Sequence, residues 1–215
     1  MQRTVGGRGL QNKIGGAGLV TGVTDVACGL SGDLGIEGGV EGDFRLRKIV
    51  NGMAGNIEEL FAIRQSRAED VARVIEIWRG AVDATHDFLA AADRQEIDDA
   101  ACAYLAGASL WVLVDEADRP MAFSALTGSN MDALFVAAEA RGRGLGTRLV
   151  RHALSLSAEL STQVNEQNSH AMGFYLKLGF KPVGRDARDD SGRPYPIVHL
   201  AWDAQSRGGE PCDRP

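Results

Sequence analysis

Closely spaced glycines are the residues of this chain most suited to chemistry. They lie in the segment Arg141-Gly142-Arg143-Gly144-Leu145-Gly146-Thr147. Glycines let the backbone turn tightly and approach a ligand, which leaves several N–H groups pointing outward. An apolar stretch with helical spacing begins near Gly144, so these groups would lie at the positive end of a helix, where phosphates bind. The segment therefore predicts a phosphate or pyrophosphate site, and the alternative is a flexible turn of the same composition.

Two familiar nucleotide-binding motifs differ from this segment. Its spacing is GxGxG rather than the GxGxxG of dinucleotide-binding folds, and no acidic residue follows at the end of a next long parallel strand. A Walker loop is excluded because the glycines are not followed by a Lys-Ser/Thr pair. A phosphate bound here would occupy a loop of another kind.

Alternating and helical apolar patterns predict the elements that position this loop. Ser66 and Glu69 form a capping-box pattern before the first helix. The predicted order is β-α-α-β-β-β-α-β-α-β-β, a mixed α/β sandwich with antiparallel hairpins early and late and a βαβ crossover between them. The expected strands lie at 61–65, 110–114, 121–127, 131–136, 162–165, 180–183 and 197–201, and the expected helices at 71–82, 91–105, from 144 to about 160 and at 169–178.

Composition excludes several classes of protein. The formal net charge of −6 and the pI of about 5.3 argue against a nucleic-acid binder with a broad basic surface. The three cysteines, Cys28, Cys102 and Cys212, lie far apart, so neither a metal site nor a disulfide framework is expected. A reducing cytoplasm is then the default compartment. No apolar run approaches the roughly 18 residues of a membrane helix.

The glycines are distributed unevenly. Of the 27 in the chain, fourteen fall within residues 1–52, where no sustained periodicity is present. We expect 1–52 to be a disordered or non-native leader, with Met53 a candidate translation start. Residues 59–203 are expected to form one domain, and the polar residues 204–215 a flexible tail.

Two motifs in this chain resemble signatures of the GNAT superfamily of N-acetyltransferases. Arg141-x-x-Gly144-x-Gly146 after a strand is similar to the superfamily's acetyl-CoA pyrophosphate signature. The segment 165–180, with Asn165, Asn168, an aromatic-Tyr pair and a closing Gly-Phe, is similar to its second signature. The resemblance covers roughly 61–202. Within the superfamily, residues 84–89, 131–136 and 192–196 are most similar to small bacterial single-domain proteins of the YjaB type.

The resemblance implies the GNAT fold and an enzyme that transfers an acetyl group from acetyl-CoA to a primary amine by direct attack. Acetyl-CoA is then a co-substrate, the acceptor is a small amine or a protein amino group, and no metal is needed. The protein would act as a monomer or homodimer without binding nucleic acid or membrane. A non-catalytic acyl-CoA-binding sensor or interaction module on the same fold is the alternative.

The resemblance also assigns the cofactor-binding residues. Backbone N–H groups from Gly142 to Thr147 would hold the pyrophosphate, and the pantetheine arm would lie between two strands. An N–H near Phe135 or Val136 would polarise the thioester carbonyl, and Asn168 would bind pantetheine or phosphate or simply cap a helix. The implied cofactor-binding set is Leu134, Phe135, Val136, Arg141, Gly142, Arg143, Gly144, Leu145, Gly146, Thr147, Asn168 and Tyr175.

Three side chains are candidates for proton transfer. Tyr175 stands where the superfamily places the general acid that protonates the departing thiolate, and the alternative is a core aromatic. Asp132 could accept the amine's proton, because strand alternation would place it on one face with Leu134 and Val136; a solvated aspartate at a strand end is the alternative. His86, in the break between the first two helices, is either a second base candidate or a capping residue.

Overall fold

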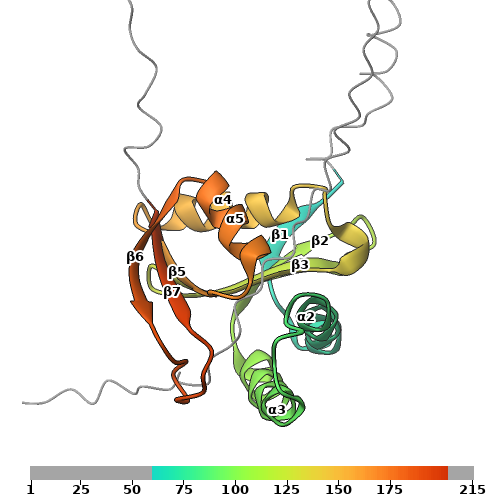
Figure 1. The fold of residues 1–215 in the computed structure, drawn as a ribbon. Coiled ribbons are helices and arrows are strands. Elements are labelled where there is room, and N and C mark those ends of the chain that lie inside the picture. Colours follow the sequence, from blue (N-terminus) through green and yellow to red (C-terminus); the bar gives the residue numbers. More distant parts are fainter. Residues whose placement is uncertain (1–59, 203–215) are drawn as a thin grey trace, which may run out of the picture.

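Seven short apolar or alternating runs form the strands of one mixed sheet within residues 60–202, the part of the chain that the computed structural model describes. Helices α4 and α5 cover one face of this sheet, and α2 and α3 cover the other (Figure 1). The expected leader at 1–52 and the tail at 204–215 lie outside the described residues.

The expected order of elements is confirmed. The strands are β1 (Ala62–Gln65), β2 (Leu110–Val114), β3 (Pro120–Thr127), β4 (Asn130–Val136), β5 (Ser161–Asn165), β6 (Phe180–Asp186) and β7 (Ile197–Trp202). The helices are α2 (Val71–Thr85), α3 (Ala91–Gly107), α4 (Leu145–Leu156) and α5 (Ser169–Lys177), with short 3-10 helices η1 (Ala68–Asp70) and η2 (Ala138–Ala140).

The strands lie in the order β1-β2-β3-β4-β5-β7-β6, and β4–β5 is the parallel pair at the centre of the sheet. That pair is short, because the ladder holds only Asn130 with Ser161 and Met131 with Thr162. Beyond Met131, β4 continues along β3 while β5 continues along β7. The two central strands therefore diverge after two pairs.

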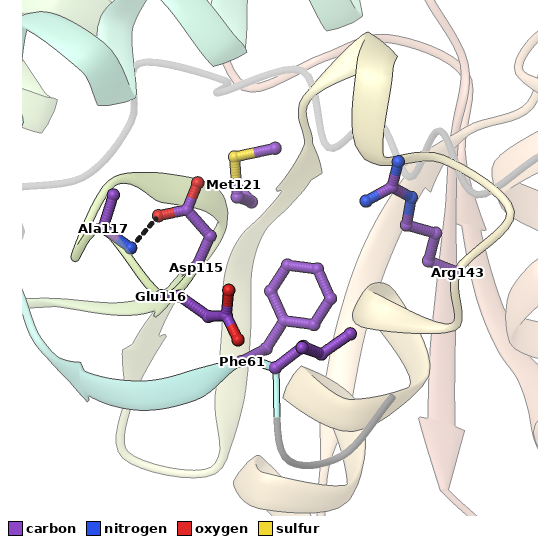
Figure 2. A pocket seen from close by; sticks show the side chains of 7 residues that line it. Phe61, Asp115, Glu116, Ala117, Met121 and Arg143 are labelled. Atoms are coloured by element: carbon purple, nitrogen blue, oxygen red, sulfur yellow. Dashed lines mark hydrogen bonds between the residues drawn. The ribbon is translucent and has the colours of Figure 1, made fainter. Parts of the chain in front are cut away.

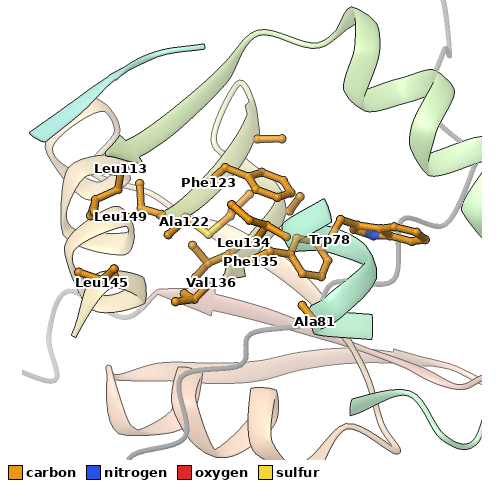
Figure 3. Packing of buried hydrophobic residues seen from close by; sticks show 14 of the residues in the cluster. Trp78, Ala81, Leu113, Ala122, Phe123, Leu134, Phe135, Val136, Leu145 and Leu149 are labelled. Carbon is orange, nitrogen blue, oxygen red and sulfur yellow. The ribbon is translucent and has the colours of Figure 1, made fainter. Parts of the chain in front are cut away.

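One core joins the sheet to helices on both faces. Trp78 and Ala81 of α2 lie on the side of Phe123 and Phe135, whose ring centroids are 5.4 Å apart (Figure 3). Side chains on the α4 side include Leu113, Ala122, Val136, Leu145 and Leu149, all fully buried. Burying one such Leu or Phe side chain contributes roughly 1.5–3 kcal/mol, so this core fixes the sheet on which the site is built.

The first helix begins differently from the expected capping box. Ser66 still belongs to the β1–β2 pairing, since its N–H donates to the Leu110 carbonyl at 2.8 Å and its hydroxyl accepts from the Leu110 N–H at 3.0 Å. Asp70 takes the capping role one residue later by accepting from the Arg67 N–H at 2.8 Å. The Ser66–Glu69 prediction was therefore wrong by one position.

Two expected boundaries also differ. β6 runs to Asp186 rather than ending at Val183, because it continues along β7 beyond a bulge between Pro182 and Gly184. The helix expected from 144 to about 160 ends at Leu156, whose side chain is 53% exposed.

Candidate active site

The loop before α4 has the backbone form of an anion-binding turn. Gly142 and Gly144 both have left-handed φ angles, 73° and 74°, on either side of Arg143. Alternation of this kind turns successive N–H groups toward one concave side. Gly144 is the N-cap of α4 and supplies no side-chain cap, so the first N–H groups of the helix face the same end. The loop can hold a phosphate or pyrophosphate through its backbone.

The two arginines of the loop point in different directions. One terminal nitrogen of Arg141 lies 3.5 Å from the Gly80 carbonyl of α2, and its Nε is buried without a hydrogen-bond partner among the described residues. Burial lowers the pKa of the Arg141 guanidinium. Arg143 is exposed and faces a neighbouring cavity. Arg141 thus ties the loop to α2, and Arg143 remains at the surface.

The cavity beside Arg143 has a volume of about 290 Å³ and lies at the turn between β2 and β3 (Figure 2). Phe61 and Met121 line it together with Asp115 and Glu116. One Asp115 oxygen is already used, since it accepts from the Ala117 N–H at 3.0 Å. Two carboxylates make this wall unsuited to a phosphate, so we separate it from the loop's anion site.

Residues 134–136 lie on the part of β4 that has left β5. The Ala137 N–H donates to the Met121 carbonyl of the β3 side at 2.8 Å. Because donors alternate along a strand, the Phe135 N–H also faces β3, and the N–H groups of Leu134 and Val136 face the side on which β5 diverges. Of the two residues expected near the thioester, Val136 is the one whose N–H faces the divergence.

Tyr175 is fully buried on the α4/α5 side of the central strand pair. Its hydroxyl donates to the Met131 sulfur at 3.6 Å, and its ring packs edge-on against Phe180 at 5.1 Å. Burial raises the pKa of Tyr175. The phenol therefore stays protonated at neutral pH, beside the last pair before β4 and β5 separate.

Asp132 lies on the opposite face of the same strand pair. The register between β3 and β4 shifts at Ala125/Leu126, so that Leu126 pairs with Met131 and Asp132 is the extra residue of a bulge. Its carboxylate accepts from the side chains of Thr127 and Asn130, at 2.5 and 2.6 Å.

The bulge overturns the expected alternation. Met131, rather than Asp132, shares a face with Leu134 and Val136, as its contact with Tyr175 on that face confirms. Asp132 is on the α2/α3 face and raises the pKa of Tyr104 of α3, although burial is the larger cause of that rise. The structure thus brings Tyr175 and Asp132 to one place in the sheet, on opposite faces.

His86, just after α2, is buried away from this pair. The Thr85 hydroxyl donates to the Ala81 carbonyl at 2.9 Å, so its oxygen must accept from His86 Nδ1 at 2.8 Å. Nε2 is then the unprotonated nitrogen, and it is buried without a partner among the described residues. Burial lowers the pKa of His86 to about 4. His86 packs on Phe88 at 5.3 Å, and none of its described contacts is with Asp132 or Tyr175.

Two buried asparagines, one ending β5 and one just after it, lie where β5 has diverged from β4. Asn168 caps α5 by accepting from the Ala171 N–H at 3.0 Å, which leaves its Nδ2 buried without a partner among the described residues. The Oδ1 of Asn165 is also buried without a hydrogen-bond partner among the described residues. Sequence reasoning missed Asn165 as a binding candidate, although its signal was present: a polar residue ending a buried strand.

The last hairpin is fastened to the start of α3. The Tyr195 hydroxyl accepts from the Ala90 N–H at 3.0 Å and donates to the Asp93 carboxylate at 2.5 Å. Asp189 is used within the turn, where it accepts from Arg193 Nε at 2.7 Å and from two backbone N–H groups. These contacts make Tyr195 and Asp189 structural residues.

Residues 60–202 contain no group of three His, Cys, Asp or Glu side chains arranged to hold a metal ion. Within the same residues, no helix is both long enough and apolar enough to cross a membrane.

Comparison with known proteins agrees with this geometry. Residues 106–182 match the family model described as "Acetyltransferase (GNAT) domain". The chain is 50% identical over 143 residues to "Peptidyl-lysine N-acetyltransferase YjaB" of Escherichia coli (strain K12), covering 66% of this chain and 97% of that protein. It is 29% identical over 141 residues to "Peptidyl-lysine N-acetyltransferase YiaC" of the same strain, covering 65% and 95%.

The solution structure of apo-form YjaB from Escherichia coli is similar to this fold, with a TM-score of 0.65 over 66% of this chain and 97% of that one. A GCN5-related N-acetyltransferase from Rhodopseudomonas palustris, 21% identical with a TM-score of 0.55, shares the fold over 66% of this chain and 94% of its own. Taken with the family model, the half-identity to YjaB over nearly its whole length shows that the chain belongs to the GNAT family of acetyltransferases.

Proposed function

We propose that this enzyme moves the acetyl group of acetyl-CoA to the ε-amino group of lysine residues in proteins or peptides. Tyr175 serves as general acid and Asp132 as general base. The amine attacks the thioester directly, so that the N–C bond forms as the C–S bond breaks without a covalent enzyme intermediate. The observation that carries this proposal is the placement of Tyr175 and Asp132 on opposite faces of the sheet, where β4 and β5 stop pairing.

The donor side of the proposal rests on backbone geometry. The left-handed Gly142 and Gly144 and the uncapped start of α4 suit the pyrophosphate of CoA. The N–H groups of Leu134 and Val136 face the diverging side, and an extended pantetheine arm can pair there with Leu134 as an added strand would. Asn168 Nδ2 and Asn165 Oδ1 are buried polar atoms suited to bind the arm's amides.

The acid and base follow from the two faces. Tyr175 donates its proton to the departing thiolate from the α4/α5 side, and Asp132 accepts a proton from the amine on the α2/α3 side. The raised pKa of Tyr175 keeps the phenol protonated in the resting enzyme, so that a proton is present when the thiolate departs. A donor and an acceptor on opposite faces can both reach the reacting centre only where the sheet opens between them.

Asp132 is a better base candidate than His86. His86 is only 4% exposed, so an acceptor amine has little access to its ring, and the burial that lowers its pKa to about 4 leaves it no more basic than an ordinary aspartate. Asp132 is partly exposed and adjacent in sequence to Met131, which contacts Tyr175. We therefore assign His86 to the packing of the α2–α3 connection against Phe88.

Lysine as acceptor is inferred from the relatives, since both YjaB and YiaC are named peptidyl-lysine N-acetyltransferases. The test is incubation with acetyl-CoA and a lysine peptide with a blocked N-terminus, followed by mass spectrometry. We expect an added acetyl group on lysine and release of one free thiol for each. Binding of acetyl-CoA without transfer to any amine would instead favour a sensor.

A further inference from the structure

We propose that the β3–β4 turn is a positioning device for the base, with Thr127, Asn130 and Ser161 orienting the Asp132 carboxylate toward the acceptor amine. This inference rests on the proposed function, in which Asp132 receives the amine's proton. It concerns three residues that no sequence motif indicated.

Both carboxylate oxygens of Asp132 are held from the turn. The Thr127 hydroxyl donates to Oδ2 at 2.5 Å, and the Asn130 amide donates to Oδ1 at 2.6 Å. Thr127 and Asn130 are themselves the pair that closes the β3–β4 hairpin, so their spacing is fixed by the turn. Each carboxylate oxygen keeps a further lone pair for an amine proton.

Ser161 connects this arrangement to β5. Its hydroxyl donates to the Asn130 side-chain carbonyl at 3.0 Å, which orients the Asn130 amide so that its NH₂ group faces Asp132. The Ser161 N–H donates to the Ser129 carbonyl at 2.9 Å. The chain of contacts therefore crosses β3, β4 and β5 where β4 and β5 still pair.

The bulge at Asp132 determines the face of the sheet on which its carboxylate lies. Without the extra residue, strand alternation would place Asp132 on the face of Tyr175, where acid and base would compete for one position. Titratable groups of other elements on the Asp132 side include Tyr104 of α3, whose pKa Asp132 helps to raise, and the His199–Asp186 pair of β7 and β6, which is joined at 2.7 Å. The turn side chains that hold Asp132 are uncharged, so they orient the carboxylate without neutralising it.

The test compares Thr127→Val, which keeps the shape and removes the hydroxyl, with Thr127→Ser, which restores the hydroxyl. The acceptors are an N-terminally blocked lysine peptide and the same peptide with thialysine, whose sulfur lowers the pKa of the amine. We expect Thr127→Val to lower kcat on the lysine peptide by about tenfold, as for one lost hydrogen bond to a charged group. The loss on thialysine should be clearly smaller, since a less basic amine needs less help from a base. Thr127→Ser should recover most of the turnover.

The controls separate positioning from general damage to the fold. Ser129→Ala changes the same turn at a residue whose backbone, rather than side chain, contacts Ser161, and it should keep wild-type turnover. In Thr127→Val, KM for acetyl-CoA and the midpoint of thermal unfolding should also be unchanged. Equal losses on both peptides, or a loss that follows a lower unfolding midpoint, would overturn the inference.

Asp132→Asn separates failure of this inference from failure of the proposed function. If Asp132→Asn abolishes turnover while Thr127→Val leaves it intact, Asp132 is the base and the turn does not position it. If Asp132→Asn has no effect, the proposed base is wrong, and the positioning role falls with it. Absence of acetyl transfer to lysine by the wild-type protein would overturn both.

Discussion

In the proposed mechanism, the loop before α4 acts through its backbone, whereas the end of the β4–β5 pairing acts through side chains. In the loop, Gly142 and Gly144 turn backbone N–H groups toward one side, and no side chain is required. At the end of the pairing, the proposed base and acid are the side chains of Asp132 on β4 and Tyr175 on α5, which only the folded sheet brings near each other, on opposite faces. Backbone chemistry can be encoded in a few adjacent residues, whereas the side-chain arrangement depends on the register of several strands.

Loss of the Tyr175 hydroxyl should have the largest effect on turnover and should leave binding at the glycine loop unchanged. Tyr175→Phe keeps the buried ring, so we expect turnover to fall by about 10²–10⁴-fold, the range for general acid–base catalysis. Acetyl-CoA affinity should change less than twofold, because the loop is untouched. Steady-state kinetics with calorimetric titration measures both. Unchanged turnover would show that Tyr175 is a core aromatic and not the acid.

His86 belongs to neither region, and its effect should appear in stability. Its folded pKa of about 4 lies below the ordinary value of 6.5, so the unfolded chain binds more protons between these values. The contribution of neutral, buried His86 to the free energy of unfolding is therefore fully present above pH 6.5. It is lost as the pH falls toward 4, by about 3 kcal/mol in all. His86→Asn should remove this dependence.

Urea unfolding of the wild type and of His86→Asn from pH 7.5 to 4 measures the difference. Subtracting the two curves cancels the groups they share, such as His152, whose pKa burial also lowers. If the free energies of unfolding of the two proteins changed with pH in parallel, His86 would not be buried in its neutral form.

The backbone of the loop can be tested at Gly144. A Cβ there would meet nothing within 4 Å, so the demand for glycine comes from its φ of +74° alone. Gly144→Ala should lower the free energy of unfolding by about 1–2 kcal/mol and weaken acetyl-CoA binding by about tenfold, while turnover at saturation stays within about twofold. Unchanged binding would remove the loop from the cofactor site.

Gly80 is the matched control and should give the smallest effect. It lies inside α2 with nothing within 4 Å of an added Cβ and no positive φ, and its carbonyl lies near Arg141. Gly80→Ala should raise the free energy of unfolding by about 0.5–1 kcal/mol and leave acetyl-CoA binding unchanged. A loss of stability in this variant would show that α2 does not tolerate a side chain at this position.

The same contrast explains what the sequence could predict. The order of elements, the start of α3 at Ala91 and the bounds of β2 follow from local apolar patterns, and the glycine loop is contiguous in sequence. Placing Asp132 on the face of Leu134 failed because the bulge arises from the β3–β4 register, which alternation along one strand does not reveal. The prediction of Ser66 as a helix cap failed for a similar reason, because its hydroxyl accepts a hydrogen bond from Leu110 at the start of the neighbouring strand β2.

Backbone amide NMR during titration with CoA tests most directly where the donor binds. We expect the largest changes in amide chemical shift in the glycine loop, at 142–147, and on β4 at Leu134 and Val136, whose N–H groups face the side on which β5 diverges. Residues 115–117, which line the acidic cavity beside Arg143, should change little. Shifts concentrated at 115–117, with the loop and β4 unaffected, would contradict a donor site at the divergence of β4 and β5.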